Sequence, residues 1–209
     1  MNSLILVDLQ NDFLPGGALA VPGGDEIIQV ANVLQSDFDM VVATKDWHPP
    51  GHGSFASAHP GSGVGDIIDL NGLPQVLWPD HCVQGSFGAE FAPALDASRV
   101  AKVFYKGADH GVDSYSGFFD NGHANATGLE DYLRSAGVER VYVMGLATDY
   151  CVKYTVIDGL SLGFHVCLIR DGCRGVELSP GDVDKTVSDM RAAGAVIASW
   201  RELEARRKP

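Results

Sequence analysis

Short apolar runs along the chain alternate with segments of helical periodicity. Short β-rich runs lie at Leu4–Val7, Met40–Ala43, Val100–Tyr105, Val141–Met144, Val166–Ile169 and Ala195–Ala198. Several of them are apolar at successive positions, which is typical of strands covered on both faces. Helical spacing of apolar residues is found at Asp25–Leu34, Thr127–Ser135, Asp149–Leu162 and Asp182–Ala193. This alternation predicts an α/β fold, a three-layer sandwich whose mostly parallel central sheet of about six strands has helices on both faces.

One long segment, residues 47–91, interrupts the alternation. It is rich in Gly, Pro, His, Ser and Asp, and it reads as irregular structure. Long irregular segments within a compact domain are usually functional or disordered, and the aromatic and histidine residues here favour function. We therefore expect a single domain over residues 1–209, in which this loop region contributes to a metal or substrate site.

Charge and cysteine content narrow the classes of function. The chain has 27 acidic and 15 basic residues and a net charge of -12, which argues against nucleic-acid binding. No signal peptide and no apolar stretch of membrane-spanning length is visible, so we expect a cytoplasmic protein without a membrane partner. In that setting Cys82, Cys151, Cys167 and Cys173 are expected to be free thiols, one of them reactive. The oligomeric state stays open, a homo-oligomer included.

Polar residues gather at the predicted carboxyl ends of the strands, where open parallel sheets bind ligands. The first strand ends at Asp8, the second at residues 45–48 (KDWH), and the third at Lys106. The fourth runs into a turn that carries Cys151. The predicted fold thus delivers a carboxylate, a metal-type cluster, an ammonium group and a thiol to one edge of the sheet.

Cys151 has two interpretations, a small core residue or a nucleophile. In the first turn of a helix, its thiolate would be favoured by the helix dipole, and backbone N–H groups there could hold an oxyanion. A nucleophilic thiol also needs a proton acceptor. No histidine follows the first or third strand, so Asp8, tuned by Lys106, is the candidate base. Taken singly, Asp8 could be a turn residue and Lys106 a surface lysine.

The pair Asp46 and His48 suggests a metal site, because side chains at i and i+2 of an extended segment point to the same side. His52 and His81 lie in the following loop region. One carboxylate with two or three imidazoles suits Zn, Fe or Mn. The alternative is a capping aspartate among unrelated loop histidines.

Five blocks of sequence resemble one family. They are VDLQNDF (7–13), ATKDWHPPGHGSFAS (43–57), LWPDHCVQG (77–85), FYKGADHGVDSYSGFFD (104–120) and GLATDYCVKYTVIDGL (145–160). In this order they are similar to bacterial nicotinamidases, within the isochorismatase-like cysteine hydrolases. The resemblance covers nearly the whole chain, and the combination of DWH with a later WPDHC is its most specific part.

The resemblance implies roles for individual residues. The family's catalytic triad falls on Asp8, Lys106 and Cys151, and its metal ligands on Asp46, His48 and His81. It leaves open whether His52 or Ser54 adds a further ligand. A cis peptide before Ala147 would direct the N–H groups of Ala147 and Cys151 at an oxyanion. The substrate ring would lie among Phe13, Leu19, Trp78, Tyr115 and Ala147.

The activity implied is hydrolysis of nicotinamide to nicotinate and ammonia through a cysteine thioester, in NAD salvage, with pyrazinamide as a second substrate. One divalent ion, zinc first and iron or manganese as alternatives, would bind the pyridine nitrogen. Three alternatives remain at this point. They are a hydrolase of another small amide or ureide, a silent metal-binding relative, and a zinc hydrolase in which metal-bound hydroxide attacks and Cys151 is dispensable.

Overall fold

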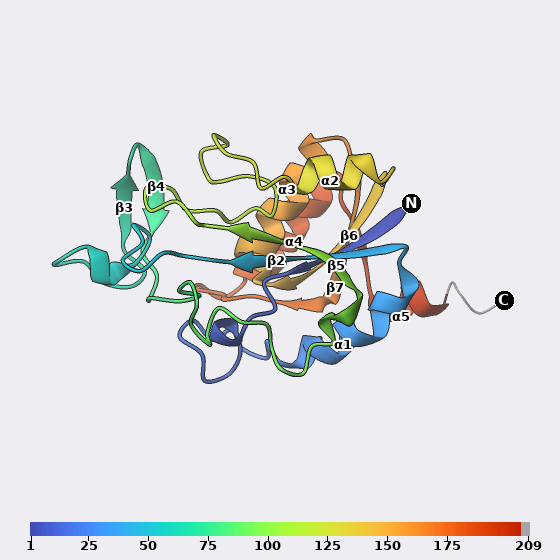
Figure 1. Ribbon diagram of the computed structural model, residues 1–209, viewed down its shortest axis with the longest axis horizontal. Helices are drawn as coiled ribbons and strands as arrows, with labels where there is room; N and C mark the ends of the chain where they lie inside the picture. Colours follow the sequence, from blue (N-terminus) through green and yellow to red (C-terminus); the bar gives the residue numbers. More distant parts are fainter. Residues whose placement is uncertain (206–209) are drawn as a thin grey trace.

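The central sheet has six strands, all parallel, in the order β5-β2-β1-β6-β7-β8 (Figure 1). The computed structural model describes residues 1–205. The strands span Asn2–Val7 (β1), Met40–Asp46 (β2), Val100–Lys106 (β5), Arg140–Leu146 (β6), His165–Arg174 (β7) and Val196–Ala198 (β8). All six predicted strands are confirmed, and β7 continues well past its predicted end.

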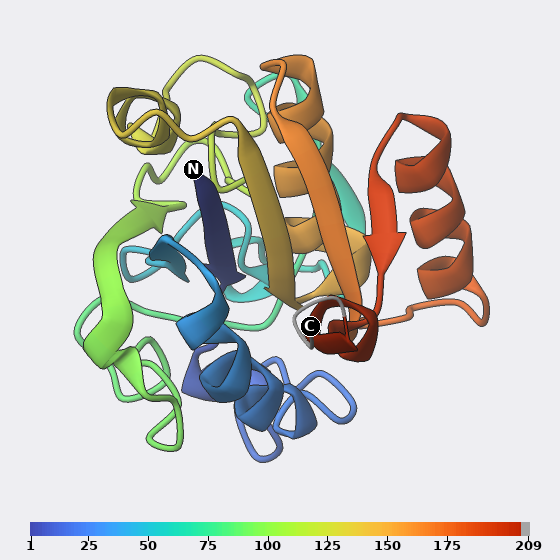
Figure 2. The same ribbon diagram turned by 90° about the vertical axis from the view of Figure 1, so that its right-hand side faces the viewer.

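Helices cover both faces of this sheet and complete the three layers. They are α1 (Glu26–Leu34), α2 (Leu129–Ser135), α3 (Lys153–Ser161), α4 (Asp182–Ala192) and α5 (Trp200–Ala205). Figures 1 and 2 show α1 and α5 together on one face and α2, α3 and α4 on the other. In α1 the buried residues have the spacing of one helical face, which explains why this face packs on the sheet. They are Ile27, Ile28, Ala31 and Leu34.

Short helical turns connect these elements. Within residues 1–205, four are 3₁₀ helices, at Asn11–Phe13, Gln35–Asp37, Ala56–Ala58 and Ala97–Arg99. A π-helical turn, Thr148–Val152, leads directly into α3. The helix predicted to begin near Asp149 therefore begins with a wider turn.

The segment expected to be irregular, residues 47–91, contains regular structure as well. Strands β3 (Ile67–Leu70) and β4 (Leu73–Val76) pair antiparallel in a separate hairpin, which projects from one end of the molecule (Figure 1). Its turn residues Asn71 and Gly72 have φ of 54° and 90°. Two positive φ angles at Asn-Gly are typical of a type I′ hairpin turn, which the expectation of a purely irregular loop overlooked.

The core lies along the two central strands. Residues 4–7 of β1 are fully buried, as consecutive apolar residues between two helical layers require. Where β1 meets β6, Gly145 has φ of 133°, and a Cβ there would lie 2.1 Å from the carbonyl oxygen of Val7. Glycine therefore permits the close approach of these strands immediately before the segment that carries Cys151.

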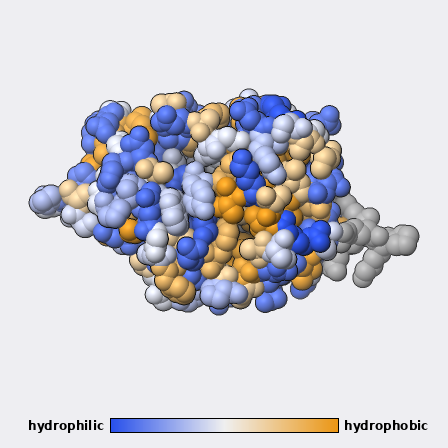
Figure 3. All heavy atoms as spheres, viewed as in Figure 1, coloured by the Kyte–Doolittle hydropathy of each residue, from blue (hydrophilic) through white to orange (hydrophobic). Residues whose placement is uncertain are grey.

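The outer surface is mostly polar. Figure 3 shows hydrophilic residues over much of one face and a smaller hydrophobic patch near its middle, in the region of the edge strand β5. Tyr105 of β5 is 51% exposed. Within residues 1–205 no helix is both long enough and apolar enough to cross a membrane. All four cysteines are free, as predicted.

Candidate active site

The carboxyl ends of β1, β2, β5 and β6 bring the predicted catalytic residues together. Asp46 and Lys106 are direct register partners on neighbouring strands. Asp8 follows β1 with φ of 50°, a left-handed conformation that aspartate tolerates better than most residues. After β6, the Leu146–Ala147 peptide is cis, as the family resemblance implied, and the π-helical turn then places Cys151 beside the other three.

Lys106 contacts each of the other three residues, Asp8, Asp46 and Cys151. Its Nζ lies 2.9 Å from Asp8 Oδ2, 2.9 Å from Asp46 Oδ1, 3.3 Å from Cys151 Sγ and 3.0 Å from the carbonyl oxygen of Ser114. Burial by itself lowers the pKa of Lys106, but the carboxylates of Asp46 and Asp8 raise it well above its ordinary value. The side chain is therefore an ammonium ion at all physiological pH values, and it is no proton carrier.

The two carboxylates on Lys106 differ in basicity. Burial raises the pKa of Asp8, and Lys106 opposes this effect only in part. Burial also acts to raise the pKa of Asp46, but His48 and Lys106 hold it well below the ordinary value. Asp8 is therefore the stronger proton acceptor of the pair, whereas Asp46 stays ionised.

The sulfur of Cys151 is buried in this polar surrounding. Burial raises the pKa of the Cys151 thiol well above its ordinary value, and the attraction of Lys106 does not compensate. The position at a helix start suggested a favoured thiolate, but the loss of solvation outweighs that contribution. The resting residue is a thiol, so attack on a substrate requires a base, and the raised pKa of Asp8 suits that task.

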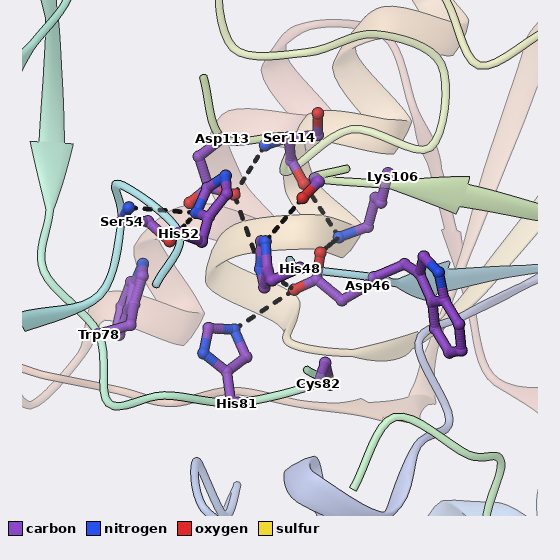
Figure 4. Close-up of polar contacts among 12 residues, drawn as sticks. Asp46, His48, His52, Ser54, Trp78, His81, Cys82, Lys106, Asp113 and Ser114 are labelled. Carbon is purple, nitrogen blue, oxygen red and sulfur yellow. Dashed lines mark hydrogen bonds and ion pairs between the residues drawn. The ribbon is translucent and has the colours of Figure 1, made fainter. Parts of the chain in front are cut away.

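Next to this group, Asp46, His48 and His81 form a cluster whose ligand atoms all lie within 4.8 Å of one another (Figure 4). Asp46 Oδ2 is 3.2 Å from His48 Nε2 and 3.4 Å from His81 Nε2. Atoms bound tetrahedrally at about 2.0–2.1 Å to one ion are separated by roughly 3.3 Å, so the spacing fits a shared metal.

Hydrogen bonds prepare both imidazoles to bind a cation. His48 Nδ1 lies 2.9 Å from the Gly107 carbonyl and His81 Nδ1 lies 2.8 Å from the Pro79 carbonyl. A carbonyl only accepts, so each Nδ1 carries the hydrogen and each Nε2 presents a lone pair. Apart from its 3.2 Å contact with Asp46 Oδ2, His48 Nε2 is buried and has no hydrogen-bond partner among the described residues. The donor set therefore fits a divalent metal ion.

His52 and Ser54 lie near the cluster but bind each other. His52 Nδ1 accepts the Ser54 backbone N–H at 3.1 Å and lies 2.7 Å from Ser54 Oγ. Its Nε2 donates to the carbonyl of Asp109 at 2.7 Å. Both ring nitrogens are thus engaged, and the His52 ring packs 4.4 Å from that of His48 (Figure 4). In this arrangement the His52 ring packs against His48, and the cluster has three candidate ligands, Asp46, His48 and His81.

A pocket opens beside Cys151, and all five predicted substrate residues line it, namely Phe13, Leu19, Trp78, Tyr115 and Ala147. Asp46 and His81 also line this pocket, so the candidate metal cluster and the thiol face one space. Trp78 Nε1 donates to the Tyr115 hydroxyl at 3.2 Å, which fixes the two rings relative to each other. This mixture of aromatic and polar side chains suits a small aromatic ligand that carries polar groups.

Three further residues line the pocket and were not predicted, Asp113, Tyr150 and Val176. Asp149 holds Val176 in place, because its carboxylate accepts the N–H groups of Val176 and Glu177 at 3.0 and 2.7 Å. Val176 follows the carboxyl end of β7, so the rule about strand ends would have found it had that strand been predicted at full length. Asp113 stands in a loop without periodicity, and no local pattern marks it.

A doubly covered parallel sheet with a buried cysteine, carboxylate and lysine at its carboxyl edge is the architecture of a cysteine hydrolase. Residues 2–202 match the isochorismatase domain, and the chain belongs to the isochorismatase family. The nicotinamidase of Escherichia coli strain K12 is 53% identical over 97% of this chain and 98% of its own.

Two solved structures extend the comparison. An Acinetobacter baumanii nicotinamidase and pyrazinamidase is 42% identical, with a TM-score of 0.94 and 97% of each chain covered. The pyrazinamidase of Pyrococcus horikoshii, solved in complex with zinc, is 38% identical, with a TM-score of 0.77 over 95% of this chain and 98% of its own.

Proposed function

We propose that the protein is a nicotinamidase, which hydrolyses nicotinamide to nicotinate and ammonia through a thioester on Cys151 and so serves NAD salvage. The similarity to the Escherichia coli nicotinamidase supports the substrate. The observation that carries the chemistry is the Lys106 ammonium, which joins Asp8, Asp46 and Cys151 within 3.3 Å. Pyrazinamide, a ring carboxamide of the same shape, is a second substrate.

Asp8 and Cys151 perform the bond-making steps. Asp8 takes the thiol proton as Cys151 Sγ attacks the carboxamide carbon, and the N–H groups of Ala147 and Cys151 hold the oxyanion. As the tetrahedral intermediate collapses, Asp8 gives its proton to the amide nitrogen, the C–N bond breaks and ammonia leaves. The same carboxylate then deprotonates the water that attacks the thioester, the C–S bond breaks, and Asp8 returns the proton to the sulfur of Cys151. Lys106 keeps its charge throughout and stabilises the anionic states of both groups.

Asp46, His48 and His81 would hold one divalent ion, and we propose zinc, which is the metal in the similar Pyrococcus horikoshii structure. When bound, this ion supplies a positive charge that orients the pyridine nitrogen and withdraws electrons from the ring. Phe13 and Trp78 offer aromatic surfaces for the ring within the pocket. Because Asp46 contacts both the cluster and Lys106, it fixes the ligand site relative to the nucleophile.

Release of ammonia from nicotinamide tests the proposal. We expect turnover by the purified enzyme, strong loss after chelation and recovery on adding zinc. Replacement of Cys151 by Ala should abolish turnover while thermal unfolding and metal content stay unchanged. Turnover by that variant at more than a few per cent of the normal rate would remove Cys151 as nucleophile and favour attack by metal-bound hydroxide. If the enzyme released ammonia only from amides other than nicotinamide, nicotinamide would be excluded as its substrate.

A further inference from the structure

The carboxylate of Asp8 is held by a residue outside the triad, Thr44 of β2. Thr44 Oγ1 donates a hydrogen bond to Asp8 Oδ1 at 2.6 Å, and Thr44 Oγ1 also accepts the backbone N–H of Asp8 at 3.2 Å. Both residues are at most 1% exposed, so water cannot replace either contact. One hydroxyl group thus fixes both the side chain and the backbone of the proposed base.

This contact distinguishes the two oxygens of Asp8. Oδ1 is occupied by the hydroxyl hydrogen of Thr44. Oδ2 lies 2.9 Å from Lys106 Nζ, and apart from this ion pair it is buried without a hydrogen-bond partner among the described residues. Cys151 Sγ contacts the same Nζ at 3.3 Å. Oδ2 of Asp8, unlike Oδ1, therefore shares its ammonium partner with the sulfur of Cys151.

We propose that Thr44 is a positioning residue that makes Oδ2 of Asp8 the atom that takes the proton from Cys151. The proposal rests on the function proposed above. In the step concerned, the S–H bond of Cys151 breaks, an O–H bond forms on Asp8 Oδ2, and the sulfur electron pair attacks the carboxamide carbon. The proton later leaves Oδ2 for the amide nitrogen, which departs as ammonia when the C–N bond breaks. Rotation of the carboxylate would turn the occupied oxygen toward the sulfur and interrupt both transfers.

The choice of threonine matches this task. A β-branched side chain has few χ1 rotamers, so the hydroxyl keeps its direction. A Cβ placed on Gly117 would lie 3.0 Å from the Thr44 methyl, which shows that the methyl packs against the backbone at Gly117. Valine has the same shape without the hydroxyl, whereas serine has the hydroxyl without the methyl. These two substitutions separate hydrogen bonding from packing.

The experiment compares T44V and T44S by steady-state kinetics with nicotinamide, with rates expressed per folded, metal-loaded enzyme. For T44V we expect kcat to fall roughly 10- to 100-fold while KM stays within about twofold, because the pocket and the metal cluster are untouched. T44S should keep at least about half of kcat, although it loses the methyl contact. T44A repeats the removal of the hydroxyl without adding a buried methyl group.

The matched control is Ser3→Ala, which removes another fully buried hydroxyl, on the neighbouring strand β1, whose oxygen has no partner among the described residues. We expect its kcat to be that of the wild type. A kcat for T44V and T44A within twofold of wild type would overturn the role of Thr44, as would equal losses in T44S and T44V. Either result would leave the nicotinamidase proposal intact, since that depends on wild-type turnover and on Cys151.

Discussion

The side-chain amide of Gln10 clamps the backbone of Asp46, and its removal should cost both stability and metal affinity. Gln10 Nε2 donates to the carbonyls of Asp46 and Ala89 at 2.8 and 2.9 Å, and Gln10 Oε1 accepts the Asp46 N–H at 2.8 Å. The side chain is fully buried. Because Asp46 belongs to the candidate metal cluster and also contacts Lys106, these hydrogen bonds fix the residue that connects the two.

Gln10→Met keeps the approximate volume and leaves three buried backbone groups without partners. At about 1–3 kcal/mol for each unsatisfied group, with partial relaxation, the free energy of unfolding should fall by about 3–6 kcal/mol. Gln35 provides a matched control, since it is also buried but donates only one hydrogen bond, to the Asp96 carbonyl at 2.8 Å. For Gln35→Met the same reasoning gives a loss of about 1–2 kcal/mol.

Urea denaturation at 25 °C measures the free energy of unfolding of both variants, and the slope m should be the same for the two. We expect Gln10→Met to be less stable than Gln35→Met by more than about 1 kcal/mol. Its affinity for zinc should also fall by roughly 10- to 100-fold, as for the loss of other groups that orient metal ligands, while Gln35→Met binds zinc normally. Stabilities within about 1 kcal/mol of each other, or unchanged zinc affinity in Gln10→Met, would refute the reasoning.

Two further predictions concern the cluster and the thiol. Replacement of His48 by Ala should lower the amount of bound zinc, measured by elemental analysis, and raise KM for nicotinamide. Replacement of the exposed His165, at the start of β7, is the control and should change neither quantity. Full zinc content in the His48 variant would exclude this histidine as a ligand. Only the thiolate reacts with iodoacetamide, and burial raises the pKa of Cys151 well above 9.0. At pH 7, iodoacetamide should therefore modify Cys151 in the chelated enzyme more slowly than it modifies glutathione. The rate of modification should still rise above pH 9. Rapid modification at pH 6, followed by mass spectrometry of the peptide, would instead indicate a stabilised thiolate.

Much of this site could be predicted because strand ends are visible in a sequence. Asp8, Asp46 and Lys106 each follow an apolar run, and a parallel sheet brings such positions to one edge. Thr44 and Gln10 could not be found this way, because their roles depend on which atoms they meet on a neighbouring strand. The direction of the shift in the Cys151 pKa was also not predicted. Burial of the thiol depends on the whole site, whereas the local sequence shows only that Cys151 lies at the start of a helix.

The β3–β4 hairpin was missed for a different reason. Its strands are short and only partly buried, so their hydrophobic pattern is weak. The turn signal Asn71-Gly72 was present in the sequence, but the abundance of glycine, proline and histidine around it favoured an irregular loop. Turn chemistry was thus more informative here than composition.

The most direct measurement is to trap the covalent intermediate. Enzyme mixed with excess nicotinamide is quenched in acid within milliseconds, digested, and examined by mass spectrometry for a nicotinoyl group. We expect that group on the sulfur of Cys151, on no other residue, and absent when Cys151 is replaced by Ala. A nicotinoyl group on another side chain, or normal ammonia release by the alanine variant, would contradict nucleophilic attack by this cysteine.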